Sequence, residues 1–196
     1  MEPAEAAGPV AEHAPRRTYV LVDGENIDAT LGTSVLQRRP AADERPRWER
    51  VRKYAEAQWG QPVTGLFFLN ASSGHLPGPF VQALLALDYR PVPLSGRSDE
   101  KVVDVGIQRT LEALVPRDAD VFLVSHDGDF LPQMTALLGG ERRLGVLGFR
   151  EYVNAQYTAL GLEIHDLEDD VKAFNVPLPR VRIIDLVDFD PDYFLR

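Results

Sequence analysis

Residues 121–130 read VFLVSHDGDF, an apolar run that stops at Asp127 and Asp129, two aspartates one residue apart. The apolar run in 119–125 is typical of a buried strand. The segment 129–140 is typical of a helix, with Asp129 as its expected N-cap, a proline in its first turn and two glycines after it. Carboxylates this close repel each other unless water, a helix N-terminus or a cation lies between them. This junction therefore marks a strand–helix boundary of the fold and is also a candidate for a functional site.

On both sides of this junction, short apolar runs alternate with amphipathic stretches along most of the chain. The strands expected from these runs are 18–24, 61–70, 89–94, 119–125, 143–149 and 162–167, and the other helices are expected within 48–60, 77–88 and 98–115. Two prolines in 89–94 favour an edge or irregular position for that strand. Strands that alternate with helices predict βαβ units, and hence a mostly parallel sheet of five or six strands with helices on both faces.

Composition limits the class of protein and the kinds of site. A chain of 196 residues, 44% hydrophobic and 26% charged, suits one soluble globular domain. The Ala/Pro/Glu-rich segment 1–16 is expected to be a disordered leader. It lacks the pattern of a secretory signal, so we expect a cytoplasmic protein that does not associate with membranes. There is no cysteine, which excludes disulfides and thiolate sites. Any metal site would use oxygen ligands, as Mg²⁺ and Mn²⁺ do.

Charge is distributed unevenly along the chain. The net charge of −9 argues against a simple nucleic-acid coat protein, because such proteins are normally basic. Residues 38–53 nevertheless hold seven basic side chains against three acidic ones, which suits either a basic docking patch or a solvated helix face. The tail 175–196 is acidic and could be a docked strand, or an extended arm that a protein partner reads or that contacts the chain itself.

Acidic residues fall where the predicted strands end. Asp23 ends the first strand, Asp127 and Asp129 follow the fourth, and Asp104 lies one turn into the helix after the third. Ligands of open parallel sheets bind at these carboxyl ends. Each acid alone has a structural explanation as a turn residue, a cap or a partner of the helix dipole. Together, four carboxylates at one edge would be neutralised by one or two divalent cations, a device of phosphodiester hydrolysis.

Three motifs, YVLVDGENID (19–28), SDEKVVDVGIQRTLEAL (98–114) and VFLVSHDGDFLPQM (121–134), resemble the NYN domains of the PIN-like nuclease superfamily. The resemblance covers roughly residues 17–170. It implies a Rossmann-like three-layer α/β/α fold and Mg²⁺- or Mn²⁺-dependent cleavage of RNA. The expected organisation is therefore a leader (1–16), an NYN domain (17–174) and an acidic tail (175–196).

The resemblance also implies roles for individual residues. The metal-binding acids would be Asp23, Asp104, Asp127 and Asp129, with Asn26 orienting water or the phosphate and Ser125 supporting the site by hydrogen bonding. Lys101 would neutralise a phosphate oxygen, or would pair with Asp104. His126 departs from the small residue found in many relatives. It would either contact substrate or point away from the site, and the second orientation is favoured. The segment 32–47 is longer and richer in arginine than a minimal connection, as in loops that select substrates.

Three functions follow as hypotheses. The first is a metal-dependent endoribonuclease whose basic segment contacts the RNA backbone through Arg38, Arg39, Arg47, Arg50 and Lys53. The second is a catalytically weak or inactive module that binds RNA or a protein, as the negative charge and the acidic tail favour. The third, a phosphoaspartate enzyme, is disfavoured because the strand at 143–149 ends without a lysine. The sequence leaves open which RNA is bound, whether DNA is accepted and the oligomeric state.

Overall fold

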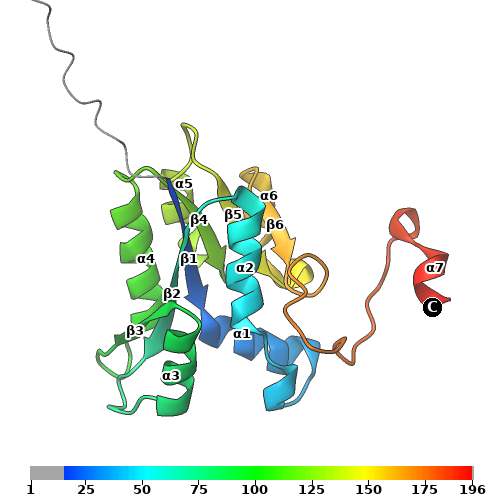
Figure 1. The fold of residues 1–196 in the computed structure, drawn as a ribbon, viewed down its shortest axis with the longest axis horizontal. Helices are drawn as coiled ribbons and strands as arrows, with labels where there is room; N and C mark the ends of the chain where they lie inside the picture. The colour runs from blue at the N-terminus through cyan, green and yellow to red at the C-terminus, as the bar shows by residue number, and fades with distance from the viewer. Residues whose placement is uncertain (1–15, 196) are drawn as a thin grey trace, which may run out of the picture.

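The computed structural model describes residues 16–195, so nearly all of the predicted leader lies outside the described residues. Its centre is one six-stranded sheet in the order β3-β2-β1-β4-β5-β6, in which every neighbouring pair is parallel (Figure 1). The strands are β1 (Arg17–Asp23), β2 (Val63–Asn70), β3 (Tyr89–Leu94), β4 (Ala119–Val124), β5 (Leu144–Gly148) and β6 (Glu163–Asp166). The predicted parallel sheet is confirmed, with six strands in the order typical of Rossmann folds.

Helices cover both faces of the sheet, because alternate residues of each strand point to opposite sides. Val20 and Val22 of β1 belong to one apolar cluster, whereas Leu21 belongs to a second cluster. The first cluster includes residues of α1 (Gly24–Thr30), α2 (Trp48–Trp59) and α3 (Gly78–Ala86), and the second includes residues of α4 (Val102–Leu114), α5 (Leu131–Ala136) and α6 (Ala155–Ala159). The predicted three-layer α/β/α architecture is thereby confirmed.

The chain changes direction across the sheet between β1 and β4. From β1 it proceeds outward through β2 to the edge at β3, and α4 then returns it to β4, on the other side of β1. Neighbouring connections therefore diverge at this point, and a crevice is expected beyond the carboxyl ends of the two strands. Asp23 is the last residue of β1, and Ser125 directly follows β4, so the topology places both at this switch point.

Strand β3 lies at an open edge of the sheet, as its prolines predict. The carbonyl oxygen of Leu94 accepts a hydrogen bond of 2.7 Å from the amide of Ala71, which follows β2. Since peptide groups of alternate residues point to opposite sides of a strand, those of 90, 92 and 94 face β2. Pro91 and Pro93 therefore occupy two of the three outward-facing positions of β3, where they have no amide proton to donate.

The chain packs against the domain beyond β6 and then extends away from it. Leu167, Val171, Ala173 and Leu178 are buried, so packing continues slightly past the predicted boundary at 174. From Val181 onward the apolar side chains are mostly exposed, and the short helix α7 (Pro191–Phe194) lies apart from the sheet (Figure 1). None of the helices in residues 16–195 is long and apolar enough to cross a membrane.

Candidate metal centre

Three carboxylates converge beyond the carboxyl ends of the central strands. One oxygen each from Asp104, Asp127 and Asp129 lies within 4.8 Å of the others. Asp104 comes from the first turn of α4, which is fixed on the sheet by the buried side chains of Val103 and Ile107. Asp127 and Asp129 come from the turn after β4. Two elements far apart in the sequence thus bring like charges together.

The turn after β4 is held by its own hydrogen bonds. The side chain of Asp127 accepts a 2.9 Å bond from the amide of Asp129 and caps the short 3₁₀ turn Gly128–Phe130. The expected cap at Asp129 is therefore wrong, because Asp127 caps this turn and α5 begins with no side-chain cap bond. Gln108 of α4 donates to the carbonyl oxygen of Asp129 (3.2 Å), and the Tyr157 hydroxyl donates to that of Asp127 (2.6 Å).

Asp23 lies beside this group of three without belonging to it, and is only 3% exposed. Its carboxylate accepts hydrogen bonds from the Asn26 amide (3.2 Å) and the Ser125 hydroxyl (3.0 Å). Ser125 in turn accepts from the Asp127 amide (3.3 Å), so its hydroxyl connects Asp23 to the turn after β4. Burial raises the pKa of Asp23 to about 6, with a further upward contribution from the Asp104 carboxylate, although the two hydrogen bonds oppose the shift.

Lys101 bridges two of the acids. Its ammonium nitrogen lies 3.4 Å from Asp104 Oδ2 and 3.3 Å from Asp129 Oδ2, and the two contacts raise the pKa of Lys101. Of the two roles expected for this lysine, the structure shows the pairing with Asp104 and adds the contact with Asp129. The lysine side chain is largely exposed, so it neutralises only part of the negative charge of the cluster.

Asn26 and His126 meet next to Asp23. Asn26 Oδ1 accepts a 2.9 Å bond from the His126 amide and lies 2.8 Å from His126 Nδ1. The other ring nitrogen, Nε2, accepts a 2.9 Å bond from the amide of Phe149. The ring is buried, and burial lowers the pKa of His126 to about 4, so the imidazole is neutral at physiological pH. His126 therefore contacts a predicted site residue from within the protein.

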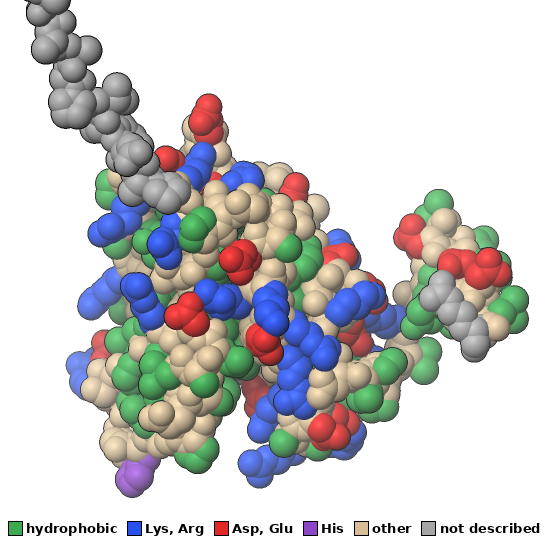
Figure 2. Space-filling view, viewed as in Figure 1, with side chains coloured by type: hydrophobic (Ala, Val, Ile, Leu, Met, Phe, Trp, Pro, Cys, Tyr) green, Lys and Arg blue, Asp and Glu red, His purple; other side chains and the backbone are tan. Residues whose placement is uncertain are grey.

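The basic segment 38–53 begins at the same end of the molecule, because α2 returns the chain from the carboxyl end of β1. Several of its side chains have partners inside the protein. Arg38 forms a double hydrogen bond with Glu44 (2.7 and 2.5 Å), Lys53 pairs with Glu49 (2.5 Å), and Arg50 donates to the carbonyl oxygens of Lys172 and Phe174 (2.9 and 2.6 Å). Arg39 is exposed. Figure 2 shows Lys and Arg side chains around the lower part of α2, interspersed with acids.

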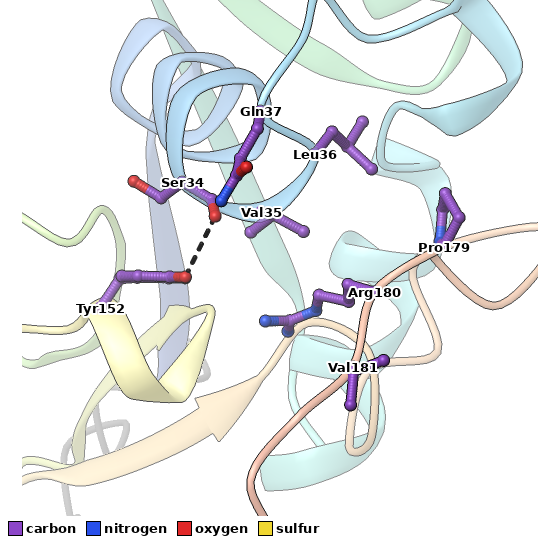
Figure 3. Close-up of a pocket in the computed structure, with 8 residues that line it drawn as sticks. All are labelled: Ser34, Val35, Leu36, Gln37, Tyr152, Pro179, Arg180 and Val181. Carbon is purple, nitrogen blue, oxygen red and sulfur yellow. Dashed lines mark hydrogen bonds between the residues drawn. The ribbon is translucent and has the colours of Figure 1, made fainter.

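The segment 32–47, expected as a long loop, is partly helical. α1 continues into a π-helical turn (Leu31–Val35), and a 3₁₀ turn spans Ala42–Glu44. A cavity of about 360 Å³ borders the first of these turns and is lined on its other side by residues 179–181 of the C-terminal segment (Figure 3). Its rim is fixed by the Tyr152 hydroxyl, which donates to the carbonyl oxygen of Ser34 (3.2 Å). The cavity is lined by none of the four predicted metal-binding acids.

The donor set fits a hard divalent cation. All charged groups of the cluster are carboxylates, and oxygen ligands are those that Mg²⁺ and Mn²⁺ prefer. The mutual repulsion of Asp104, Asp127 and Asp129 is only partly relieved by Lys101, so a cation would find charge there to neutralise. Asp23 and Ser125 lie close enough to support such a site through hydrogen bonds.

A family model described as NYN domain matches residues 17–160, from the first residue of β1 to the end of α6. This match covers most of the chain. The chain belongs to the NYN domain family. NYN domains are part of the PIN-like nuclease superfamily, which agrees with the parallel sheet and the acids at its carboxyl end. Comparison with curated proteins gave no match. In this NYN domain, β6 lies beyond the matched residues and extends the sheet by one strand.

Sequence reasoning did not find every residue that shapes the centre of this NYN domain. Tyr157 and Gln108 hold the turn after β4 from elements distant in the sequence, and nothing in their local patterns indicates it. His126 was visible as a departure from the family pattern, but its bond to Asn26 joins residues 100 positions apart. Contacts of this kind depend on how the elements pack and leave no periodic signal along the chain.

Proposed function

We propose that this NYN domain is a metal-dependent endoribonuclease that hydrolyses phosphodiester bonds of RNA in the cytoplasm. The main support for the proposal is that carboxylate oxygens of Asp104, Asp127 and Asp129 lie within 4.8 Å of one another at the switch point of the sheet. Membership of a nuclease-like family supports it independently. The proposed ligands are these three acids together with Asp23, and the proposed cation is Mg²⁺ or Mn²⁺.

The residues of the site have distinct proposed tasks. A bound divalent cation would supply positive charge to the phosphate and to the oxygen atoms that exchange on phosphorus. Asp104, Asp127 and Asp129 would hold this cation together with the neighbouring Asp23, and Ser125 would fix Asp23 relative to the turn after β4. Lys101 would leave its carboxylate partners when the cation binds and then pair with a phosphate oxygen. Its exposure leaves it room to do so.

The basic segment is proposed to contact the RNA backbone outside the cluster. Arg39 is exposed and is the strongest candidate, whereas Arg38 and Lys53 would first have to exchange an intramolecular carboxylate for a phosphate. Arg47 is only partly exposed and its Nε is buried, so it is a weaker candidate. Arg50 has several acceptors within the protein, so we assign it to anchoring the C-terminal segment. Phosphate contacts of this kind give affinity and salt dependence without sequence specificity.

Asp127→Asn tests the proposed site. Asparagine also serves as a helix cap, so this variant keeps the turn but removes one negative charge from the cluster. Cleavage of labelled single-stranded and hairpin RNA is measured in Mn²⁺, in Mg²⁺ and in chelator. We expect the variant to lose activity by at least about 100-fold, since the charge that holds the cation acts mainly in the transition state.

Asp99→Asn is the matched control, because Asp99 is an exposed carboxylate that contacts Arg97 outside the cluster. It should retain wild-type cleavage. Robust cleavage by Asp127→Asn in a nuclease-free preparation would refute the assignment.

A second candidate function is an RNA-binding or protein-binding module without catalysis. The observation that favours it is the ammonium of Lys101, which already bridges Asp104 and Asp129. Thermal unfolding in increasing Mn²⁺ separates the two functions. A cation that binds the folded state raises the melting temperature with its concentration, whereas no shift up to millimolar Mn²⁺ together with no cleavage would support the inactive module.

A further inference from the structure

Two backbone amides determine the orientations of His126 and Asn26. An amide N–H can only donate, so the Asn26 atom that faces the His126 amide must be the oxygen. For the same reason His126 Nε2, which faces the Phe149 amide, must be the unprotonated nitrogen. The remaining ring nitrogen, Nδ1, then carries the proton and donates to Asn26 Oδ1. The hydrogen-bond network thus sets both the tautomer of the ring and the direction of the carboxamide.

The packing around His126 leaves the ring little freedom. It stacks on the Phe149 ring, with 5.7 Å between centroids and 9° between planes. A Cβ atom at Gly148 would lie only 2.8 Å from His126 Cδ2, so the last residue of β5 must be glycine for the ring to fit. The His126 side chain is therefore held between β5 and the beginning of α1, with both nitrogens occupied.

The carboxamide of Asn26 is consequently fixed in one sense. Both hydrogen bonds from His126 end on Oδ1, which turns the NH₂ group away from the histidine. Asn26 also lies three residues after Asp23, and its backbone N–H donates a hydrogen bond to the Asp23 carboxylate. As long as His126 is in place, the carboxamide cannot flip, so the NH₂ group stays on the side away from the histidine.

We propose that His126 is a positioning residue that locks the Asn26 carboxamide, so that its NH₂ group is a fixed, uncharged donor to a phosphate oxygen of the substrate. This inference rests on the proposed nuclease function and extends it to a residue outside the carboxylate set. A neutral donor held in place before the substrate arrives needs no reorganisation during the reaction. Without His126 the carboxamide could rotate and present its oxygen, which would repel the phosphate.

A double-mutant cycle tests the proposal. His126→Phe keeps the ring and its stacking but removes both nitrogens, and it is compared with Asn26→Ala and with the double variant. We expect His126→Phe to lower kcat by about ten-fold or more with KM changed less than about two-fold, because the donor acts on the transition state. If His126 acts through Asn26, the double variant should be no slower than Asn26→Ala alone.

His165→Phe is the matched control for the loss of a buried histidine. His165 of β6 is 7% exposed and its Nδ1 lies 2.7 Å from the Tyr54 hydroxyl, outside the carboxylate cluster. It should lose stability while keeping kcat within about two-fold. Gly148→Ala is a second variant that displaces the ring with both nitrogens retained, and it should reproduce the loss in kcat.

Wild-type kcat in folded His126→Phe would overturn the proposal, as would losses that multiply in the double variant. A ¹⁵N spectrum of the imidazole and the side-chain amide signal of Asn26 give a readout that needs no activity. The expected spectrum is the Nδ1–H tautomer, with an Asn26 signal that moves in His126→Phe. An Nε2–H tautomer would refute the lock even if RNA is cleaved. Absence of cleavage by the wild type with the expected spectrum would refute only the nuclease function.

Discussion

Among single residues, Asp23 is an ionisable side chain at a position almost without solvent, which disfavours its charged form. It is almost fully buried at the end of β1, and burial raises the pKa of its carboxyl to about 6. The folded state therefore holds a proton on Asp23 at pH values where the unfolded chain has lost it. The stabilisation from this proton is complete below the ordinary pKa of 3.8 and is lost as the pH rises through about 6.

Asp23→Asn is expected to stabilise the metal-free protein at pH 7.5, because it removes a buried charge and keeps an oxygen for the Asn26 amide. A rise of the pKa from 3.8 to about 6 corresponds to about 3 kcal/mol. Chemical unfolding of both proteins in chelator at pH 5 and pH 7.5 measures the effect, which should shrink at the lower pH. Equal stability of the two proteins at pH 7.5 would contradict the elevated pKa.

At the scale of elements, α4 positions Asp104 by its packing on the sheet. Ile107 lies one turn after Asp104, is fully buried, and belongs to the cluster that α4 shares with β4 and α5. Ile107→Ala should lower the free energy of unfolding by about 3 kcal/mol, from lost burial and the cavity left behind. Urea unfolding measures this loss. Arg109→Ala, at an exposed position of the same helix, is the control and should change stability by less than about 0.5 kcal/mol.

Elements were more predictable than the contacts between them. The prolines of 89–94 indicated an edge strand and the acid at 104 fell in the first turn of a helix, because both depend on local backbone preferences. The sequence predicts Asp129 as the cap, whereas the structure has Asp127, because both aspartates satisfy the local pattern. Lys101 reaches both Asp104 and Asp129 because α4 packs against the turn Gly128–Phe130 that follows β4. The spacing along the sequence indicates only the contact with Asp104, three residues away.

In the molecule as a whole, the C-terminal segment (175–196) has two parts, of which the first packs on the domain and the second does not. Up to residue 182 it is anchored, because Leu178 is buried, Arg180 pairs with Glu151 and Glu168, and Arg182 pairs with Asp169. Beyond it, Ile183, Leu186 and Val187 are mainly exposed, although Ile184 is less so. The predicted self-contact of the tail therefore involves its basic residues and acids near β6.

Two truncations are expected to separate these parts. Removal of residues 183–196 should leave the free energy of unfolding within about 0.5 kcal/mol of the full chain, because it removes little buried surface. Removal of residues 175–196 should lower it by about 2 kcal/mol or more, because Leu178 and the partners of Glu151 and Glu168 are lost. Chemical unfolding of the three chains measures both effects. Equal loss in the two truncations would show that the outer arm also packs on the domain.

The open edge at β3 has a consequence for the behaviour of the protein in concentrated solution. An unpaired edge normally offers amide donors to any extended chain that meets it, and sheets then grow from molecule to molecule. Here Pro91 and Pro93 occupy two of the three outward positions and offer no donor, so Tyr89 is the one outward residue of β3 with an amide proton. A wide parallel sheet can thus end in solvent on this flank without nucleating intermolecular β-structure, and the molecule needs neither a covering helix nor a partner strand there to stay dispersed.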